Sequence, residues 1–76
     1  LRVDHRQAKY FRALPLHHSQ TEMINDEYSI FHYRLRITDD FVAELLSYGP
    51  SVTVLEPPEL RAIMKTRLAE ALKGYE

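Results

Sequence analysis

Histidine is the residue type in this chain most able to bind a metal ion. His17 and His18 are adjacent, whereas His5 and His32 lie far from them in the sequence. Adjacent histidines in a loop rarely point at one ion, and no pair shows the His-x3-His spacing typical of a zinc site. The chain also has no cysteine. We therefore predict no metal site and no metal cofactor, and expect residues 18–20 to fix a loop through hydrogen bonds between side chains and backbone.

Two adjacent carboxylates, Asp39 and Asp40, have the right chemistry for a general acid and base. They lie at an expected helix start, where carboxylates accept amide hydrogen bonds and stabilise the helix dipole, so their position has a structural explanation. The serines lack a Gly-x-Ser-x-Gly setting, and two glycines are too few for a glycine-rich phosphate loop. We predict that the chain is not an enzyme and carries no cofactor.

The strongest candidate for a binding surface is a row of basic residues on the strand expected at residues 28–37. In a strand, successive side chains point to opposite faces of the sheet. The apolar residues Phe31, Tyr33, Leu35 and Ile37 should face the helices. The residues that alternate with them should therefore lie on the open face of the sheet. By the same alternation, Arg2 should join this open face from the first strand. The candidate effector-binding or nucleic-acid-binding residues are Arg2, His32, Arg34 and Arg36.

Arginine suits phosphate, because its planar guanidinium forms two parallel hydrogen bonds to an anion. The aromatic residues that would stack on bases are expected on the other face, so this surface should hold a nucleic-acid backbone or an acidic protein rather than read bases. Two alternatives stay open. The arginines could pair with Glu22, Glu44 or Glu56, or meet only water, and the patch could serve contacts between domains or subunits.

Apolar spacing and turn residues predict the order β-α-β-β-α-β-α. We expect strands at residues 1–4, 20–24, 28–37 and 52–55, and helices at residues 6–14, from 38 or 39 to 48, and 57–73. Asn25-Asp26-Glu27 is typical of a hairpin turn, Pro15 should stop the first helix, and Gly49-Pro50 the second. Such an α+β chain folds as a ferredoxin-like βαββαβ sandwich, here with an additional C-terminal helix.

The last expected helix is longer than a small sheet needs, because seventeen residues span about 25 Å. Its apolar residues Leu60, Ile63 and Met64 should belong to the core. Exposed apolar patches often mark association. We therefore predict that the far end forms an interface through Leu68, Leu72 and Tyr75.

The composition is that of one small soluble domain. With 76 residues the chain buries only about 60% of its extended surface, so packing against another domain or copy is expected. A net charge of −1 gives no global attraction to nucleic acid or anionic lipid, and no apolar run is long enough to span a membrane. The chain opens on a strand-like Leu-Arg-Val. We interpret it as a single domain, residues 1–76, from a longer cytoplasmic protein, and expect its first strand to be truncated.

Three segments resemble the C-terminal extension, or WCX domain, of WYL-domain transcriptional regulators. They are Leu14-Pro-Leu-His-His-Ser-Gln20, Leu45-Leu-Ser-Tyr-Gly49 and Val52-Thr-Val-Leu-Glu-Pro-Pro-Glu-Leu-Arg61. The individual motifs are modest, but their order and spacing cover nearly the whole chain. The name-giving Trp-Tyr-Leu residues should lie upstream, since this chain has no tryptophan. No ligand residue of the family is therefore carried over.

The resemblance implies a bacterial regulator with an upstream helix-turn-helix domain and a WYL barrel. It implies that this domain acts without catalysis, in dimerisation and in sensing an effector that is a nucleic acid or a nucleotide. We expect a homodimer and no membrane contact. An alternative of another class is a stand-alone ferredoxin-like sensor, such as an ACT domain, that binds a small molecule at a dimer seam. A third alternative is a small enzyme with this fold.

Overall fold

The computed structural model describes all residues from 1 to 76. The chain alternates short strands with helices, and one 3₁₀ turn precedes the last strand. The elements are β1 (Arg2–Asp4), α1 (His5–Ala13), β2 (Thr21–Ile24), β3 (Tyr28–His32), α2 (Asp39–Ser47), η1 (Gly49–Ser51), β4 (Val52–Thr53) and α3 (Pro58–Lys73). The predicted α+β class and the order of the elements are confirmed.

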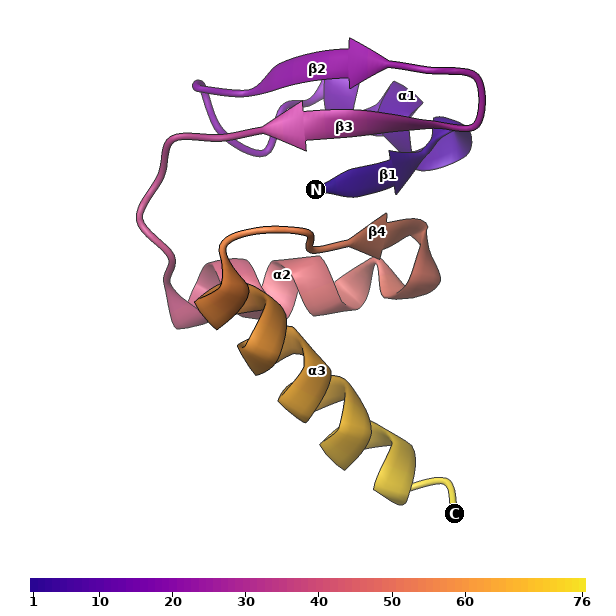
Figure 1. Cartoon of the computed structure of the whole chain (residues 1–76), viewed down its shortest axis with the longest axis vertical. Coiled ribbons are helices and arrows are strands. Elements are labelled where there is room, and N and C mark those ends of the chain that lie inside the picture. The colour runs from indigo at the N-terminus through magenta and orange to yellow at the C-terminus, as the bar shows by residue number, and fades with distance from the viewer.

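The four strands form one antiparallel sheet in the order β2-β3-β1-β4. The centre of the sheet is therefore β3 and β1, which are separated in sequence by α1 and β2 (Figure 1). The registers align Met23 with Ile30, Ile30 with Arg2, and Arg2 with Thr53. One row of side chains thus crosses all four strands on the same face.

Side-chain caps begin both of the early helices. Asp4 caps α1, because its carboxylate accepts a hydrogen bond from the Gln7 amide at 2.7 Å. Thr38 caps α2 in the same way, with Asp39 and Asp40 in the first turn. The two aspartates therefore have a structural position at a helix start.

The core lies between the sheet and the helices. Phe31 is only 1% exposed and contacts Phe11 of α1 edge-on, with ring centroids 5.6 Å apart. Tyr48, after α2, also contacts Phe11 edge-on, with ring centroids 5.0 Å apart. The buried hydrophobic residues are Val3, Ala8, Phe11, Phe31, Val42, Leu45, Val52, Val54, Leu60 and Met64. Since α1 and the sheet meet through Phe31, the opposite face of the sheet is the open one.

The third strand is shorter than predicted. It ends at His32, and residues 33–38 have no regular structure. A strand persists only where a neighbour pairs with it, and β2 reaches only as far as the Thr21–His32 pair. The fourth strand also ends early, at Thr53 rather than Leu55. The first helix likewise ends at Ala13, one residue before the expected end, and Leu14 is 79% exposed.

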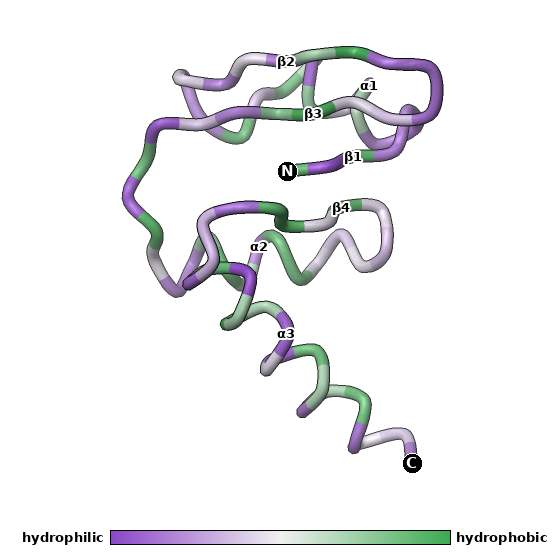
Figure 2. Tube along the Cα trace, viewed as in Figure 1, coloured by the Kyte–Doolittle hydropathy of each residue, from purple (hydrophilic) through white to green (hydrophobic).

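The last helix leaves the body of the molecule after its second turn (Figure 1). Of the apolar residues predicted to face the core, only Leu60 and Met64 are buried, whereas Ile63 is 39% exposed. Apolar stretches nevertheless continue along the far half of α3 (Figure 2). No helix of the chain is both long and apolar enough to cross a membrane.

Candidate functional site

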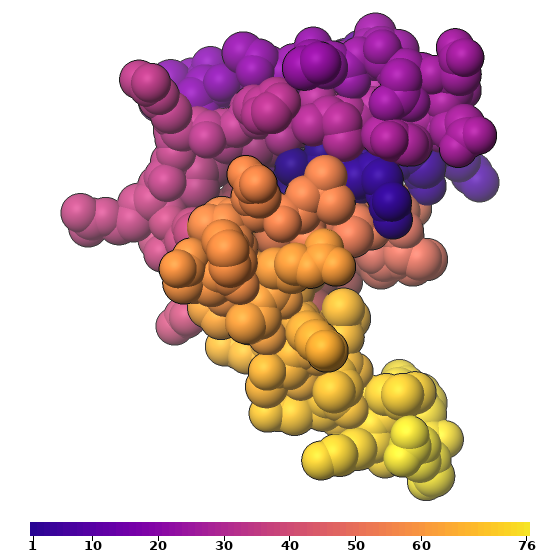
Figure 3. Space-filling view, in the orientation of Figure 1, coloured from indigo at the N-terminus to yellow at the C-terminus, as the bar shows by residue number.

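The face of the sheet opposite α1 is uncovered. In Figure 3 the atoms of β2 and β3 lie at the surface, and no helix crosses them. Side chains paired across an antiparallel sheet share a face. The open face therefore carries Thr21 and His32 in one row, Tyr28 and Asp4 in another, and the four-strand row between them.

Two of the predicted binding residues, Arg2 and His32, are exposed on this open face. The Arg2 guanidinium carbon lies 5.7 Å from the centroid of the Tyr28 ring, within reach of a cation–π interaction. The Arg2 side chain therefore lies near the start of β3, whereas His32 is the last residue of this strand.

The other two, Arg34 and Arg36, lie beyond the end of β3 and not on the sheet. Both are exposed in the segment 33–38. The Arg34 amide donates a hydrogen bond of 2.8 Å to the Ser19 hydroxyl, which ties this segment to the loop between α1 and β2. His17 holds the same hydroxyl through Nδ1 at 2.7 Å. The row expected on one flat face is thus divided between the sheet and the adjoining loop.

Arg2, Arg34 and Arg36 have no carboxylate partner. The ion pair of the chain joins Arg12 to Glu22, at 2.6 Å, and no other lies within 4.0 Å. Glu44 accepts a hydrogen bond from the Tyr48 hydroxyl instead, and burial with this bond raises the pKa of Tyr48 to about 12. The pairing of Arg34 or Arg36 with Glu22, Glu44 or Glu56, left open by the sequence, is absent.

The sequence reasoning missed Tyr28 as a residue of the open face. It placed the aromatic residues on the helix-facing side, which holds for Phe31 but not for Tyr28, whose side chain is half-buried beside Arg2. The alternation itself contained the information, because 28 has the same parity as 30 and 32. The open face therefore combines a cation with an aromatic ring.

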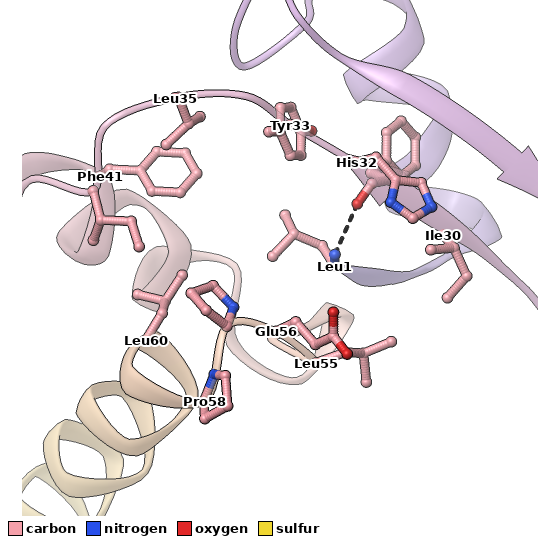
Figure 4. Close-up of a pocket in the computed structure, with 13 residues that line it drawn as sticks. Leu1, Ile30, His32, Tyr33, Leu35, Phe41, Leu55, Glu56, Pro58 and Leu60 are labelled. Carbon is pink, nitrogen blue, oxygen red and sulfur yellow. Dashed lines mark hydrogen bonds between the residues drawn. The ribbon is translucent and has the colours of Figure 1, made fainter.

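A groove of about 780 Å³ opens between the end of β3 and the segment that joins β4 to α3 (Figure 4). Leu1 lies in it between Tyr33 and Glu56, with its amino group donating a 2.8 Å hydrogen bond to the Phe31 carbonyl. Most of the lining is apolar. Burial raises the pKa of the Tyr33 phenol well above its usual value, and this hydroxyl donates to Gln20 at 2.7 Å.

The loop between α1 and β2 is fixed by its own side chains, as expected. Gln20 donates to the Phe11 carbonyl at 2.8 Å and accepts from the Leu16 amide at 3.2 Å. The rings of His17 and His18 lie with centroids 4.1 Å apart. The chain contains no group of three His, Asp or Glu side chains that could hold a metal ion.

The predicted interface residues are exposed at the far end of the chain. Leu68 is 50%, Leu72 58% and Tyr75 91% exposed. Leu68 and Leu72 are four residues apart in α3 and share one helical face, whereas Tyr75 lies in the turn after the end of α3 at Lys73.

Fold and surface together define a small α+β domain with an open sheet face, on and beside which three arginines lack a carboxylate partner. A family model described as the WCX domain matches residues 1–72. The chain therefore belongs to the WCX domain family, as its motifs indicate. No curated protein and no solved structure matches it significantly. Membership of this family is consistent with a C-terminal module of WYL-type regulators.

Proposed function

We propose that this chain is the non-catalytic C-terminal regulatory module of a WYL-type transcriptional regulator. The proposal adds two finer roles, dimerisation and the sensing of an anionic effector. The observation that supports the second role most directly is the set of exposed arginines without carboxylate partners, Arg2, Arg34 and Arg36. An unpaired guanidinium at a surface keeps its hydrogen-bond donors free for a ligand.

The effector proposed is a nucleic acid or a nucleotide. Both carry phosphate, which two parallel guanidinium N–H groups hold better than an ammonium group does. Arg34 and Arg36 are on a segment tied down by the Ser19 hydroxyl, so part of the entropy cost of ordering them is already met. In the full regulator the WYL barrel would complete the site, and the upstream helix-turn-helix domain would contact the operator in the cytoplasm.

Replacing Arg34 and Arg36 together with alanine is expected to weaken binding of a single-stranded oligonucleotide. Each phosphate contact on a single strand contributes about 0.7 to the slope of log affinity against log salt, so the slope should fall by about 1.4. Fluorescence anisotropy with a labelled ten-nucleotide oligo-dT, at several salt concentrations, measures both quantities.

The matched control is Arg6→Ala with Lys9→Ala. It removes the same charge from the exposed side of α1, on the other layer of the molecule. Affinity and slope should change less than in the Arg34 and Arg36 variant. Equal effects of the two variants would show that binding depends on overall charge and would remove the proposed site.

Dimerisation is proposed through an exposed apolar stripe, formed by Leu68 and Leu72 of α3 and by Tyr75 just beyond the end of this helix. A partner that covers the half-exposed leucines removes their apolar surface from water. This burial stabilises the complex by about 25 cal/mol per Å² of apolar surface. The partner proposed is a second copy of the same protein, with the upstream domains attached.

Leu68→Glu with Leu72→Glu is expected to convert a dimer into a monomer, because two charges would have to be buried in the interface. Sedimentation velocity measures the change. Thr66→Glu adds such a charge to an exposed position on the opposite side of α3 and should leave the dimer intact. A dimer that survives the first pair of substitutions would assign dimerisation to another surface.

The fold is proposed to be the ferredoxin-like split βαβ. The strand order β2-β3-β1-β4, with every neighbouring pair antiparallel, supports this assignment. The helix α3 is then the addition to that fold, as the order of elements predicts.

A second candidate function is a small-molecule sensor. The apolar groove of about 780 Å³ favours it, because pockets of 300–1,000 Å³ are the usual size for such ligands. A ligand there would contact Leu35, Phe41 and Leu60 and lie near the Glu56 carboxylate. An oligonucleotide that binds regardless of substitutions in this groove would favour the first function over this one.

A further inference from the structure

The open face of the sheet has features that a phosphate-only contact does not require. Its central strands present an aromatic ring, an imidazole and an aliphatic side chain in alternate positions of β3: Tyr28, Ile30 and His32. Alternate residues of a strand are about 6.6 Å apart and point the same way. The three side chains therefore form a line along β3 on the open face of the sheet.

Flat rings on an exposed sheet are platforms for the faces of unpaired bases. Every base has such a face, so stacking tolerates any sequence, and it is worth about 1–3 kcal/mol per base. The Arg2 guanidinium already lies over the Tyr28 ring at 5.7 Å, which places a positive charge beside the platform. A phosphate next to a stacked base would meet this charge.

Charged groups of opposite sign lie at the two ends of β3. Negative groups gather at the start of β3: Asp4 pairs across from Tyr28, and Asp26 and Glu27 precede it in the turn. The Asp4 carboxylate is engaged as the cap of α1. Positive groups lie at the other end, where Arg34 and Arg36 follow His32. A polyanion is therefore drawn toward the end of β3 and away from its start.

We infer that the open face binds single-stranded nucleic acid, with one base stacked beside Arg2 on Tyr28, a second on His32, and the phosphate backbone leaving over Arg34 and Arg36. This rests on the proposed function and adds to it the chemical class of the effector and its place on the domain. A free mononucleotide would contact one platform only and bind more weakly.

The first test compares variants of Tyr28 in the binding of fluorescein-labelled ten-nucleotide oligo-dT. Tyr28→Ala removes the ring and should weaken binding about 5- to 150-fold, whereas Tyr28→Phe keeps it and should bind within about twofold of the wild type. Tyr10→Ala is the matched control, because Tyr10 is 63% exposed on α1. It should bind like the wild type.

The outcomes separate this inference from the proposed function. If Arg34→Ala with Arg36→Ala weakens binding and Tyr28→Ala does not, the stacking platform is overturned and the proposed function stands. If the oligonucleotide fails to bind the wild-type protein, both are overturned. If Tyr28→Ala changes the sedimentation of the free protein from dimer to monomer, a second copy covers the face and the inference is wrong.

A second measurement does not depend on the stability of the alanine variant. The chain has no tryptophan, so Tyr28→Trp introduces a single fluorescent reporter at the proposed platform. Stacking of a base on the indole should quench its emission in proportion to the anisotropy change. Emission that stays constant while the oligonucleotide saturates the protein would overturn the inference.

Discussion

Phe31→Ala is expected to lower the free energy of unfolding by about 3–5 kcal/mol, the usual cost of removing a buried phenylalanine. The side chain is 1% exposed and joins β3 to α1 through its edge-on contact with Phe11. A domain of this length has a total stability of only about 4–11 kcal/mol, so much of it would be lost. Urea denaturation followed by circular dichroism measures the change.

Tyr10→Ala is the control for this substitution. Tyr10 is 63% exposed, so its removal should change the free energy of unfolding by about 0.5 kcal/mol or less. A loss below about 1 kcal/mol for Phe31→Ala would contradict the position of β3 at the centre of the core.

Glu22→Ala is expected to destabilise the protein by about 1–3 kcal/mol, a large effect for a residue of an edge strand. Its carboxylate accepts two hydrogen bonds from Arg12, at 2.7 and 2.6 Å, and one from the Ser29 hydroxyl at 2.6 Å. Ser29 is completely buried, so its hydroxyl would lose its partner. Glu27→Ala, in the exposed turn, is the control and should cost little in the same urea experiment.

The same carboxylate makes stability depend on pH. The hydrogen bonds from Arg12, and less strongly the one from Ser29, lower the pKa of Glu22 from its usual 4.5. The ionised form is therefore favoured in the folded protein, and its contribution is fully present above pH 4.5 and lost as the pH falls through the lowered pKa. The free energy of unfolding should fall more steeply below about pH 5 in the wild type than in Glu22→Gln. Parallel curves would contradict this role.

The sequence predicts the elements well where the signal is local. The helix expected from residue 38 or 39 begins there, with Thr38 as its cap, and the hydroxyl needed for this is visible in the sequence. The alternation at positions 29–32 also holds, with Ser29 and Phe31 buried. These features depend on neighbours in the chain, so one segment is enough to recognise them.

Features that depend on distant segments were not predictable in the same way. The end of β3 at His32 is set by how far β2 extends beside it, and the sequence of β3 alone continues to alternate as far as Ile37. The hydrogen-bonded network of Ser29, Glu22 and Arg12 joins three elements. Neither the end of β3 nor this network can be recognised from the sequence of any one segment.

The candidate site was only partly predictable for the same reason. Each of Arg2, His32, Arg34 and Arg36 is exposed, but the shortened strand moves the last two from the sheet to a loop. Tyr28 was within reach of the alternation and adds an aromatic ring to the open face. The binding role of the five residues stays a proposal.

The salt dependence of oligonucleotide binding tests the central claim most directly, because it counts the phosphates that the protein neutralises. Measured on the wild type and on Arg34→Ala with Arg36→Ala, the slope is predicted to differ by about 1.4, with weaker binding in the variant at every salt concentration. Identical slopes and affinities would contradict the account, since the unpaired arginines would then not meet the effector.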